Sequence, residues 1–206
     1  MIHPLAPPLV LASGSATRRI LLHQAGLVFT VRASAVDEDD AKRRIVLRGG
    51  SAADAALVLA SAKAEASAKA GVLGRDEIVV GADQILVCDG IWFNKPRTLD
   101  EAASHLRALR GRAHHLITAA TCWRDGQSAW SIVDRAALIV RPLSDAFIDS
   151  YVVAEGDALL STVGAYRIEG RGIHLFEAIE GESTAIQGLP MLPLCAYLRT
   201  AGVLLA

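Results

Sequence analysis

The hydrophobic positions of the chain fall into short runs with strand-like or helix-like spacing. An apolar run at 9–12 predicts a short strand, and apolar residues over 20–25, followed by Gly26, predict a helix. Residues 28–33 alternate as in a strand, whereas the acidic cluster at 37–40 interrupts the pattern and indicates a loop. The first forty residues therefore predict a strand, a helix, a second strand and a loop.

Two longer segments follow. Residues 51–70 are rich in alanine and predict a helix that stops at Gly71. Residues 77–88 are dense in β-branched residues and predict a strand, although this strand carries Gly81-Ala82-Asp83-Gln84 in its middle. Asp89-Gly90 comes directly after it and predicts a hairpin turn.

The rest of the chain continues the alternation of strands and helices. The capping pattern Thr98-x-x-Glu101 predicts a helix as far as about Leu109. The later elements, in order, are strands at 114–123 and 128–140 around Asp125-Gly126, a helix at 144–153, an irregular glycine-rich segment at 164–172, and an amphipathic helix from Gly188-Leu189-Pro190 to about Ala201. This alternation, with two hairpins, predicts a mixed β-sheet in an α/β fold.

Composition and charge narrow the class of protein. The 206 residues are enough for one α/β domain or for two small lobes sharing a cleft. A content of 52% hydrophobic and 21% charged residues argues against disorder. The net charge of −1 lacks the basic excess of a general nucleic-acid binder, so we expect no nucleic-acid partner.

The cysteines and the apolar runs concern the compartment. The three cysteines are far apart and form no C-x-x-C pair, a pattern that suits a reducing compartment. The longest apolar runs have the length of strands, and the first twelve residues carry no basic segment. We therefore expect a cytoplasmic protein without a membrane partner.

A first candidate site is the segment from Ser13 to Arg19. Its small residues lie between a predicted strand and a predicted helix, where backbone amides and the helix N-terminus attract anions. Arg18 and Arg19 add donors that suit phosphate oxygens. An ordinary strand–helix turn with two solvated arginines is the alternative. The glycines match neither the dinucleotide-binding fingerprint nor the P-loop.

Four further residues are candidates, each with a plain structural alternative. Asp83 is a general base or metal ligand facing a cleft, or else a buried hydrogen-bonded aspartate. Lys95 follows the predicted hairpin and can reach a phosphate, but surface lysines are common. Lys63 fits a solvent-exposed position in its helix, and Glu38 fits a solvated acidic loop. The six histidines lack zinc-ligand spacing.

The order of these motifs along the chain is more specific than any one of them. From about Leu9 to Gly202 the chain carries, in sequence, Leu11-Ala12-Ser13-Gly14-Ser15 with Arg18-Arg19, Val36-Asp37-Glu38, Ala62-Lys63-Ala64, Val80-Gly81-Ala82-Asp83-Gln84, Lys95-Pro96, His115 through Thr118, Gly164-Ala165-Tyr166, Ile168-Glu169-Gly170 and Gly188-Leu189-Pro190. This ordered set resembles the Maf family of nucleotide pyrophosphatases. Two positions depart from the family pattern: Ala16 replaces a proline, and 161–164 lacks the acidic and basic residues of many members.

The resemblance implies a Maf/ITPase-like α/β fold. That fold is a mixed β-sheet flanked by helices, with a substrate cleft between two lobes, in a single domain over residues 1–206. It also implies hydrolysis of a nucleoside triphosphate at the α-phosphorus, which gives the monophosphate and pyrophosphate. The residues it assigns are Asp83 as the base, Glu38 and Asp83 for Mg²⁺ or Mn²⁺, and Ser13, Ser15, Arg18, Lys63 and Lys95 for the substrate phosphates. Whether the chain forms a homodimer stays open.

Three positions indicate the branch of the family. Thr17, Gln84 and Glu169 differ from the pattern typical of members that act on dTTP and UTP. Gln84 and Glu169 resemble the branch that cleaves 7-methyl-GTP, whereas Thr17 replaces an aromatic residue frequent in that branch. A carboxylate such as Glu169 accepts hydrogen bonds from a guanine edge and favours a cationic ring. Alternatively, Arg171 pairs with Glu169 in a purely structural contact.

Two other functions stay open at this point. The first is a dTTP or UTP pyrophosphatase of the same family, against which Gln84 and Glu169 argue. The second is a nucleotide-binding regulator of cell division, because the family has been described as septum-formation inhibitors. The presence of Asp83, Lys63 and Lys95 together favours catalysis, since binding alone requires no base.

Overall fold

The structure of the chain is a computed structural model, which describes residues 1–71 and 76–205. The helices are α1 (Ala16–Gln24), α2 (Glu38–Leu47), α3 (Ala52–Lys69), α4 (Leu99–Leu109), α5 (Asp145–Glu155), α6 (Ser183–Ile186) and α7 (Met191–Thr200), with 3₁₀ turns η1 (Gly156–Ser161), η2 (Val163–Ala165) and η3 (Arg171–Leu175). The strands are β1 (Leu9–Leu11), β2 (Thr30–Val31), β3 (Ile78–Cys88), β4 (Ile91–Phe93), β5 (Ala113–Arg124), β6 (Gln127–Val140) and β7 (Phe176–Glu180).

The seven strands of the described residues form one mixed sheet in the order β2-β1-β3-β5-β6-β7, with β4 paired to β3. β1 runs parallel to β2 and to β3, while β4 is antiparallel to β3 and β7 to β6. Asp89 and Gly90, with φ of 49° and 79°, have the positive values that a two-residue type I′ hairpin turn requires. The predicted α/β fold with a mixed sheet flanked by helices is confirmed.

The chain divides into two compact units. The first comprises Met1–Asp83, Thr118–Asp134 and Thr184–Ala206, and the second comprises Gln84–Ile117 and Arg135–Ser183. In the part of the chain that the structure describes, no helix combines the length and the apolar character that a membrane crossing needs.

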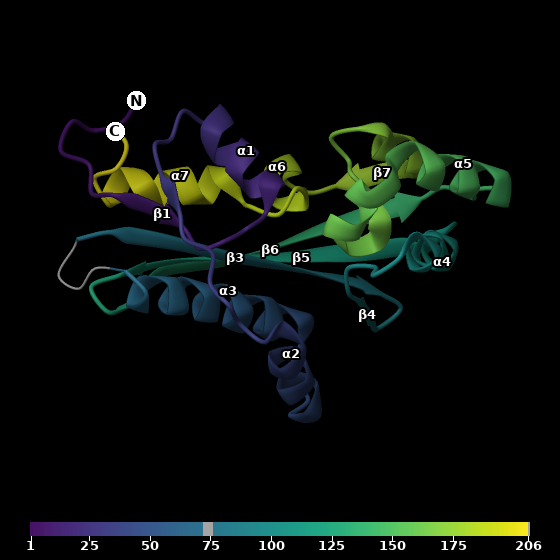
Figure 1. Cartoon of the computed structure of the whole chain (residues 1–206), viewed down its shortest axis with the longest axis horizontal. Helices are drawn as coiled ribbons and strands as arrows, with labels where there is room; N and C mark the ends of the chain where they lie inside the picture. The colour runs from purple at the N-terminus through teal and green to yellow at the C-terminus, as the bar shows by residue number, and fades with distance from the viewer. Residues whose placement is uncertain (72–75, 206) are drawn as a thin grey trace. The chain divides into compact units, whose positions relative to one another are not determined.

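Alternating residues of β1 and β3 fill two cores in the first unit. Leu9 and Leu11 of β1 and Ile78 and Val80 of β3 pack with the apolar faces of α1 and α7. Their neighbours in sequence point to the other side, where Val79 packs with Ala64 of α3. Figure 1 shows the same arrangement, with α1 and α7 on one side of β3 and α3 on the other. The period of two along β3 therefore assigns each residue either to α7 or to α3.

Gly81 allows α3 to lie directly against β3. A Cβ atom at Gly81 would be 2.1 Å from the carbonyl oxygen of Ala60 and 2.8 Å from the backbone nitrogen of Ala64. The backbones of strand and helix thus meet at a position that no larger residue can occupy without a shift. The helix itself begins at Ser51, which forms a reciprocal capping box with Asp54.

Residues 37–40 do not form the predicted loop. Asp37 is the N-cap of α2, and its side chain accepts a hydrogen bond of 2.9 Å from the backbone nitrogen of Asp40. The acidic residues of the first turn suit the positive end of the helix dipole, so the charge cluster starts a helix instead of interrupting structure. α2 buries none of its residues and contacts α3. The predicted strand at 28–33 is also shorter, being only Thr30–Val31.

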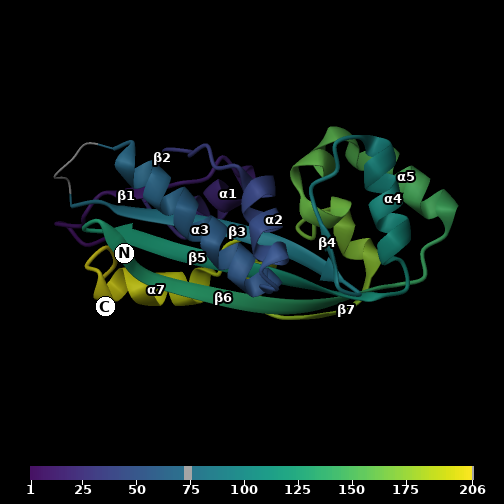
Figure 2. The same ribbon diagram turned by 90° about the horizontal axis from the view of Figure 1, so that it is seen from below.

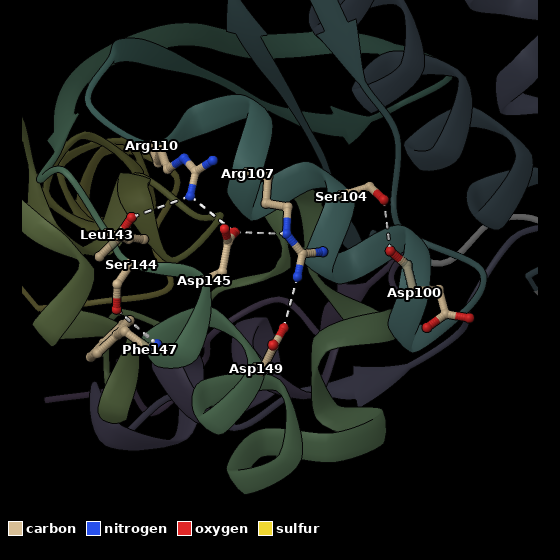
Figure 3. Close-up of polar contacts among 9 residues, drawn as sticks. All are labelled: Asp100, Ser104, Arg107, Arg110, Leu143, Ser144, Asp145, Phe147 and Asp149. Atoms are coloured by element: carbon tan, nitrogen blue, oxygen red, sulfur yellow. Dashed lines mark hydrogen bonds and ion pairs between the residues drawn. The ribbon is translucent and has the colours of Figure 1, made fainter.

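The second unit contains the pair α4 and α5, which contact each other and lie side by side in Figure 2. Arg107 of α4 binds Asp145 at 3.1 Å and Asp149 at 2.7 Å, and Arg110 binds Asp145 at 3.0 Å. Figure 3 shows how the two arginines approach the start of α5, which Ser144 caps. These side chains are exposed, so each ion pair contributes little to stability.

The glycine-rich segment after α5 is irregular, as predicted, but it is firmly packed. Tyr166 is buried, and its hydroxyl lies 2.8 Å from Nε2 of the buried His114. Burial lowers the pKa of His114 to about 4, so its ring is neutral at neutral pH. A Cβ at Gly164, whose φ is +78°, would be 2.5 Å from Leu86. α6 and β7 were not predicted from the sequence.

The contact at Gly81 makes a stability prediction. Gly81→Ala should lower the free energy of unfolding by about 2 kcal/mol or more, because the new methyl group forces the backbone of α3 away from β3. Urea denaturation measures this. The matched control is Gly14→Ala, since a Cβ at Gly14 meets nothing within 4 Å. Equal stability of the two variants would contradict the close packing described here.

Candidate active site

Arg18 is buried at the start of α1. Its Nε donates a hydrogen bond of 2.8 Å to the carbonyl oxygen of Gly188, and its NH1 donates one of 3.1 Å to Oγ of Ser13. Ser15 is the N-cap of α1 and accepts from the backbone nitrogen of Arg18. The alternative of two solvated arginines is therefore wrong for Arg18, although Arg19 is exposed.

A second buried cation lies on α3. Nζ of Lys63 is 2.6 Å from Oδ1 of Asp83 and 2.7 Å from Oε1 of Glu38. Lys63 is only 8% exposed, so the expectation of a solvent-exposed lysine in mid-helix is wrong. Glu38 is the first residue of α2, not part of a solvated loop. One ammonium group thus joins two carboxylates that are far apart in the sequence.

Backbone periodicity explains why these groups meet. Gly81 and Asp83 are two residues apart on β3 and therefore face the same side of the sheet, toward α3. Lys63 lies between Ala60 and Ala64, the residues that contact Gly81, on the buried side of the helix. The glycine brings the helix close, and the lysine next to the contact then reaches the aspartate.

Electrostatic effects tie Arg18 to the same group of charges. Burial lowers the pKa of Arg18 from its usual value, and the negative charges of Asp83 and then Glu38 act in the opposite direction. An arginine stays charged under these conditions. The first unit therefore concentrates two cations and two carboxylates within a small region.

Asp83 has one oxygen without a partner. The residue is 4% exposed, and its Oδ2 is buried without a hydrogen-bond partner. Buried polar atoms are nearly always paired, so an orphan of this kind indicates a ligand, water or ion at the site. The carboxylates of Asp83 and Glu38 are ligands that Mg²⁺ and Mn²⁺ accept.

The donor set fits a metal that is shared with a substrate. Within residues 1–71 and 76–205 no three side chains of His, Cys, Asp or Glu gather as a metal site. Mg²⁺ is commonly held by one or two carboxylates together with phosphate oxygens and water. The two carboxylates of Glu38 and Asp83, one of which has an unpartnered oxygen, meet that description, whereas they do not form an all-protein cage.

The other predicted site residues take different places. Thr17 is half-buried on α1, in the first unit. Gln84 is half-buried on β3, Lys95 is exposed between β4 and α4, and Glu169 lies in the turn before η3, all three in the second unit. The side chain of Glu169 is 31% exposed, and its Oε1 is 3.4 Å from Nε of Arg167.

The proposed structural pair of Arg171 and Glu169 is not formed. Arg171 instead binds Glu155 at 3.1 Å, and Glu155 also lies 3.9 Å from Arg167. The carboxylate of Glu155 is 5% exposed and attracts both arginines because a buried charge requires partners. Arg171 is therefore held away from Glu169.

Gly188 contacts the candidate site in a way that the sequence alone does not predict. It belongs to the Gly188-Leu189-Pro190 motif, which carries no evident function in the sequence. Its φ of +105° suits glycine alone, and its carbonyl oxygen accepts the hydrogen bond from Arg18. The glycine two residues before Pro190 is the one feature of the sequence that points to an unusual backbone conformation here.

The site combines a buried arginine with a lysine that two carboxylates share, on an α/β fold. Its cations suit a polyanion and its carboxylates suit a metal cation, as in the class of proteins that bind a metal together with a phosphorylated ligand. Residues 8–201 match the family described as Maf-like protein. The chain belongs to the Maf family.

Curated relatives agree with this assignment. The "Nucleoside triphosphate pyrophosphatase" of Gluconobacter oxydans is 46% identical over 198 residues, which cover 96% of this chain and 97% of that protein. The protein of the same name from Granulibacter bethesdensis is 44% identical over 93% of this chain and 95% of its own length. The "7-methyl-GTP pyrophosphatase" of Rhizobium meliloti is 46% identical over 96% of this chain and 98% of its own length.

Proposed function

We propose that this chain is a nucleoside triphosphate pyrophosphatase whose preferred substrate is 7-methyl-GTP. Its membership of the Maf family and the names of its relatives support the class, a hydrolase acting on phosphoanhydride bonds. The base preference is supported by the name of the Rhizobium meliloti relative and by Gln84 and Glu169.

One observation supports catalysis above the others. Asp83 is a buried carboxylate with a charged partner at one oxygen and no hydrogen-bond partner at the other. Lys63 occupies Oδ1, which leaves Oδ2 as the oxygen that can accept a proton. Such an arrangement is costly for stability alone, because an orphaned buried oxygen loses its hydration without compensation. The arrangement is understandable if Oδ2 acts on a water molecule.

The roles of the residues follow from their chemistry. Asp83 accepts a proton from the water that attacks the α-phosphorus, and pyrophosphate leaves with the bond electrons. Arg18 spends two donors on Gly188 and Ser13, which fix its plane and leave other N–H groups for phosphate oxygens. The family resemblance assigns Lys95 and Ser15 to the same polyphosphate. The nucleoside monophosphate is the second product.

A divalent cation belongs to this proposal. Glu38 and Asp83 would hold Mg²⁺ or Mn²⁺, which supplies charge neutralisation to the polyphosphate when bound. Their carboxylates already converge on a single ammonium group, within 2.7 Å and 2.6 Å. The positions of both carboxylates are therefore compatible with one shared cation.

The base preference is proposed to depend on Glu169. Triphosphate contacts are common to all nucleotides, so discrimination needs groups at the edge of the base. Glu169 lies in a tight turn, in which a Cβ at Gly172 would be 2.3 Å from the carbonyl oxygen of Arg167. An ionised carboxylate can only accept hydrogen bonds, so it suits the donors of guanine and the positive charge of its methylated ring.

A comparison of substrates tests the proposal as a whole. The protein should release pyrophosphate and a nucleoside monophosphate only with Mg²⁺ or Mn²⁺, and kcat/KM should be highest for 7-methyl-GTP among 7-methyl-GTP, GTP, UTP and dTTP. Product chromatography and a pyrophosphate assay measure this. Orthophosphate with a nucleoside diphosphate would reject the mechanism. Binding without turnover would favour the regulator, and a preference for UTP or dTTP would favour the other branch.

Removing the base should separate chemistry from binding. Asp83→Asn should lower turnover by roughly 10²–10⁴-fold while nucleotide affinity changes little, because the amide keeps the shape but cannot take the proton. Asp76→Asn is the control, since it removes a carboxylate that pairs with Arg124 on the surface. Near wild-type turnover would exclude Asp83 as the base. Loss of folding, seen by circular dichroism, would leave it only the structural role of pairing Lys63.

Changing the base edge should change specificity. Glu169→Gln, best combined with Gln84→Thr, should shift the ratio of kcat/KM from 7-methyl-GTP toward UTP or dTTP by about tenfold or more. Competition between nucleotides measures the ratio directly. Glu177→Gln, an exposed carboxylate on β7 of the same unit, is the control. An unchanged ratio in a folded, active variant would mean that base selection depends on other residues.

A further inference from the structure

Lys63 occupies the point at which the two carboxylates converge. Its Nζ contacts Asp83 at 2.6 Å and Glu38 at 2.7 Å, distances typical of charge-assisted hydrogen bonds. The remaining oxygen of Asp83, Oδ2, is buried without a hydrogen-bond partner, and the residue as a whole is only 4% exposed. A cation is thus present, but it leaves the aspartate only half satisfied.

A divalent metal and the ammonium of Lys63 compete for the same two carboxylates. One oxygen of each carboxylate contacts Nζ, so a metal held by Glu38 and Asp83 comes close to the ammonium even where it binds Oδ2 of Asp83. Two cations at such short separation repel strongly where water is scarce. The metal can therefore bind well only if the ammonium moves away.

A substrate polyphosphate supplies a reason for Lys63 to move. Lysine has a long flexible stem and a compact charge, so its ammonium can change partners without a change in the backbone. Phosphate oxygens offer it a new negative partner, and they add ligands to the metal at the same time. Glu38 can adjust as well, because α2 buries none of its residues.

We propose that Lys63 takes the place of the divalent cation in the nucleotide-free protein, so that the metal enters only together with the triphosphate. This inference rests on the proposed function, in that Glu38 and Asp83 are taken as the metal ligands. Lys63 then has two tasks in sequence: it neutralises the carboxylates before binding, and it holds phosphate afterwards. Without the metal, the ammonium of Lys63 offsets the repulsion between the two carboxylates.

Binding of Mn²⁺ to the nucleotide-free protein tests this without any measurement of activity. Electron paramagnetic resonance of free Mn²⁺ gives the dissociation constant at pH 8. Lys63→Met should lower that constant by about tenfold or more relative to wild type, because the competing charge is gone. Lys69→Met is the matched control: it removes an exposed lysine of α3 that pairs with Glu65, and it should bind Mn²⁺ as wild type does.

Further variants keep the test decisive. Removing one partner of a buried ion pair can destabilise a protein, so Lys63→Gln serves where Lys63→Met does not fold. In either variant Mn²⁺ should raise Tm more than it does in wild type, as binding to the folded state requires. Adding Asp83→Asn should abolish the gain in affinity, because Asp83 is one of the two ligands.

The outcomes separate this inference from the proposed function. No gain in Mn²⁺ affinity in a folded Lys63 variant, or a gain that survives Asp83→Asn, would overturn the inference. Metal-dependent release of pyrophosphate by wild type would still support the function in that case. Conversely, a wild type without pyrophosphatase activity would reject the function, whereas tighter Mn²⁺ binding by Lys63→Met would still show that Lys63 occupies a cation site.

Discussion

The contact between the backbones of α3 and β3 at Gly81 is the constraint on which the rest of the site depends. A side chain there would collide with Ala60 and Ala64, so the helix can lie this close only above a glycine. Lys63 belongs to the same turn of α3, and Asp83 lies two residues along the same face of β3. The close packing of the two backbones therefore allows the ammonium of Lys63 to lie 2.6 Å from the carboxylate of Asp83.

The charged groups of the site attract one another, but the cost of burying them leaves little net gain in the stability of the fold. Lys63 and Asp83 are both buried, and the desolvation of such a pair is repaid only when geometry and further hydrogen bonds are good. Here one oxygen of Asp83 has no hydrogen bond. Arg18 is held by two hydrogen bonds that it donates, one of them to the carbonyl oxygen of Gly188 in the loop before α7. This part of the structure is better suited to receiving a charged ligand than to remaining without one.

Much of the fold could be predicted from the sequence, because periodicity and turn residues are local signals. The pattern predicts the strand at 77–88, observed at 78–88, together with its Asp89-Gly90 turn and the helix that follows Ser51. Local signals failed where a distant partner decides the outcome. Lys63 looks like any exposed helix lysine until Asp83 is placed beside it, and Gly188 shows no role until Arg18 reaches its carbonyl oxygen. The acidic cluster at 37–40 differs from the predicted loop for a local reason, because Asp37 is an N-cap and the acidic residues after it form the first turn of α2.

Asp83, the proposed base, lies in the first unit, whereas Glu169, the residue proposed to select the nucleotide base, lies in the second. In the first unit the charged groups are held by buried contacts, Arg18 with Ser13 and Lys63 with Asp83, so removal of Lys63 leaves a buried carboxylate without its charged partner. In the second unit Glu169 lies in a turn with its side chain 31% exposed, whereas the core of that unit holds a separate buried pair, neutral His114 with Tyr166. A residue at the tip of such a turn can change without loss of the core beneath it. A change of base preference at Glu169 therefore requires no change in Asp83 or Lys63, the groups of the first unit proposed for phosphate cleavage.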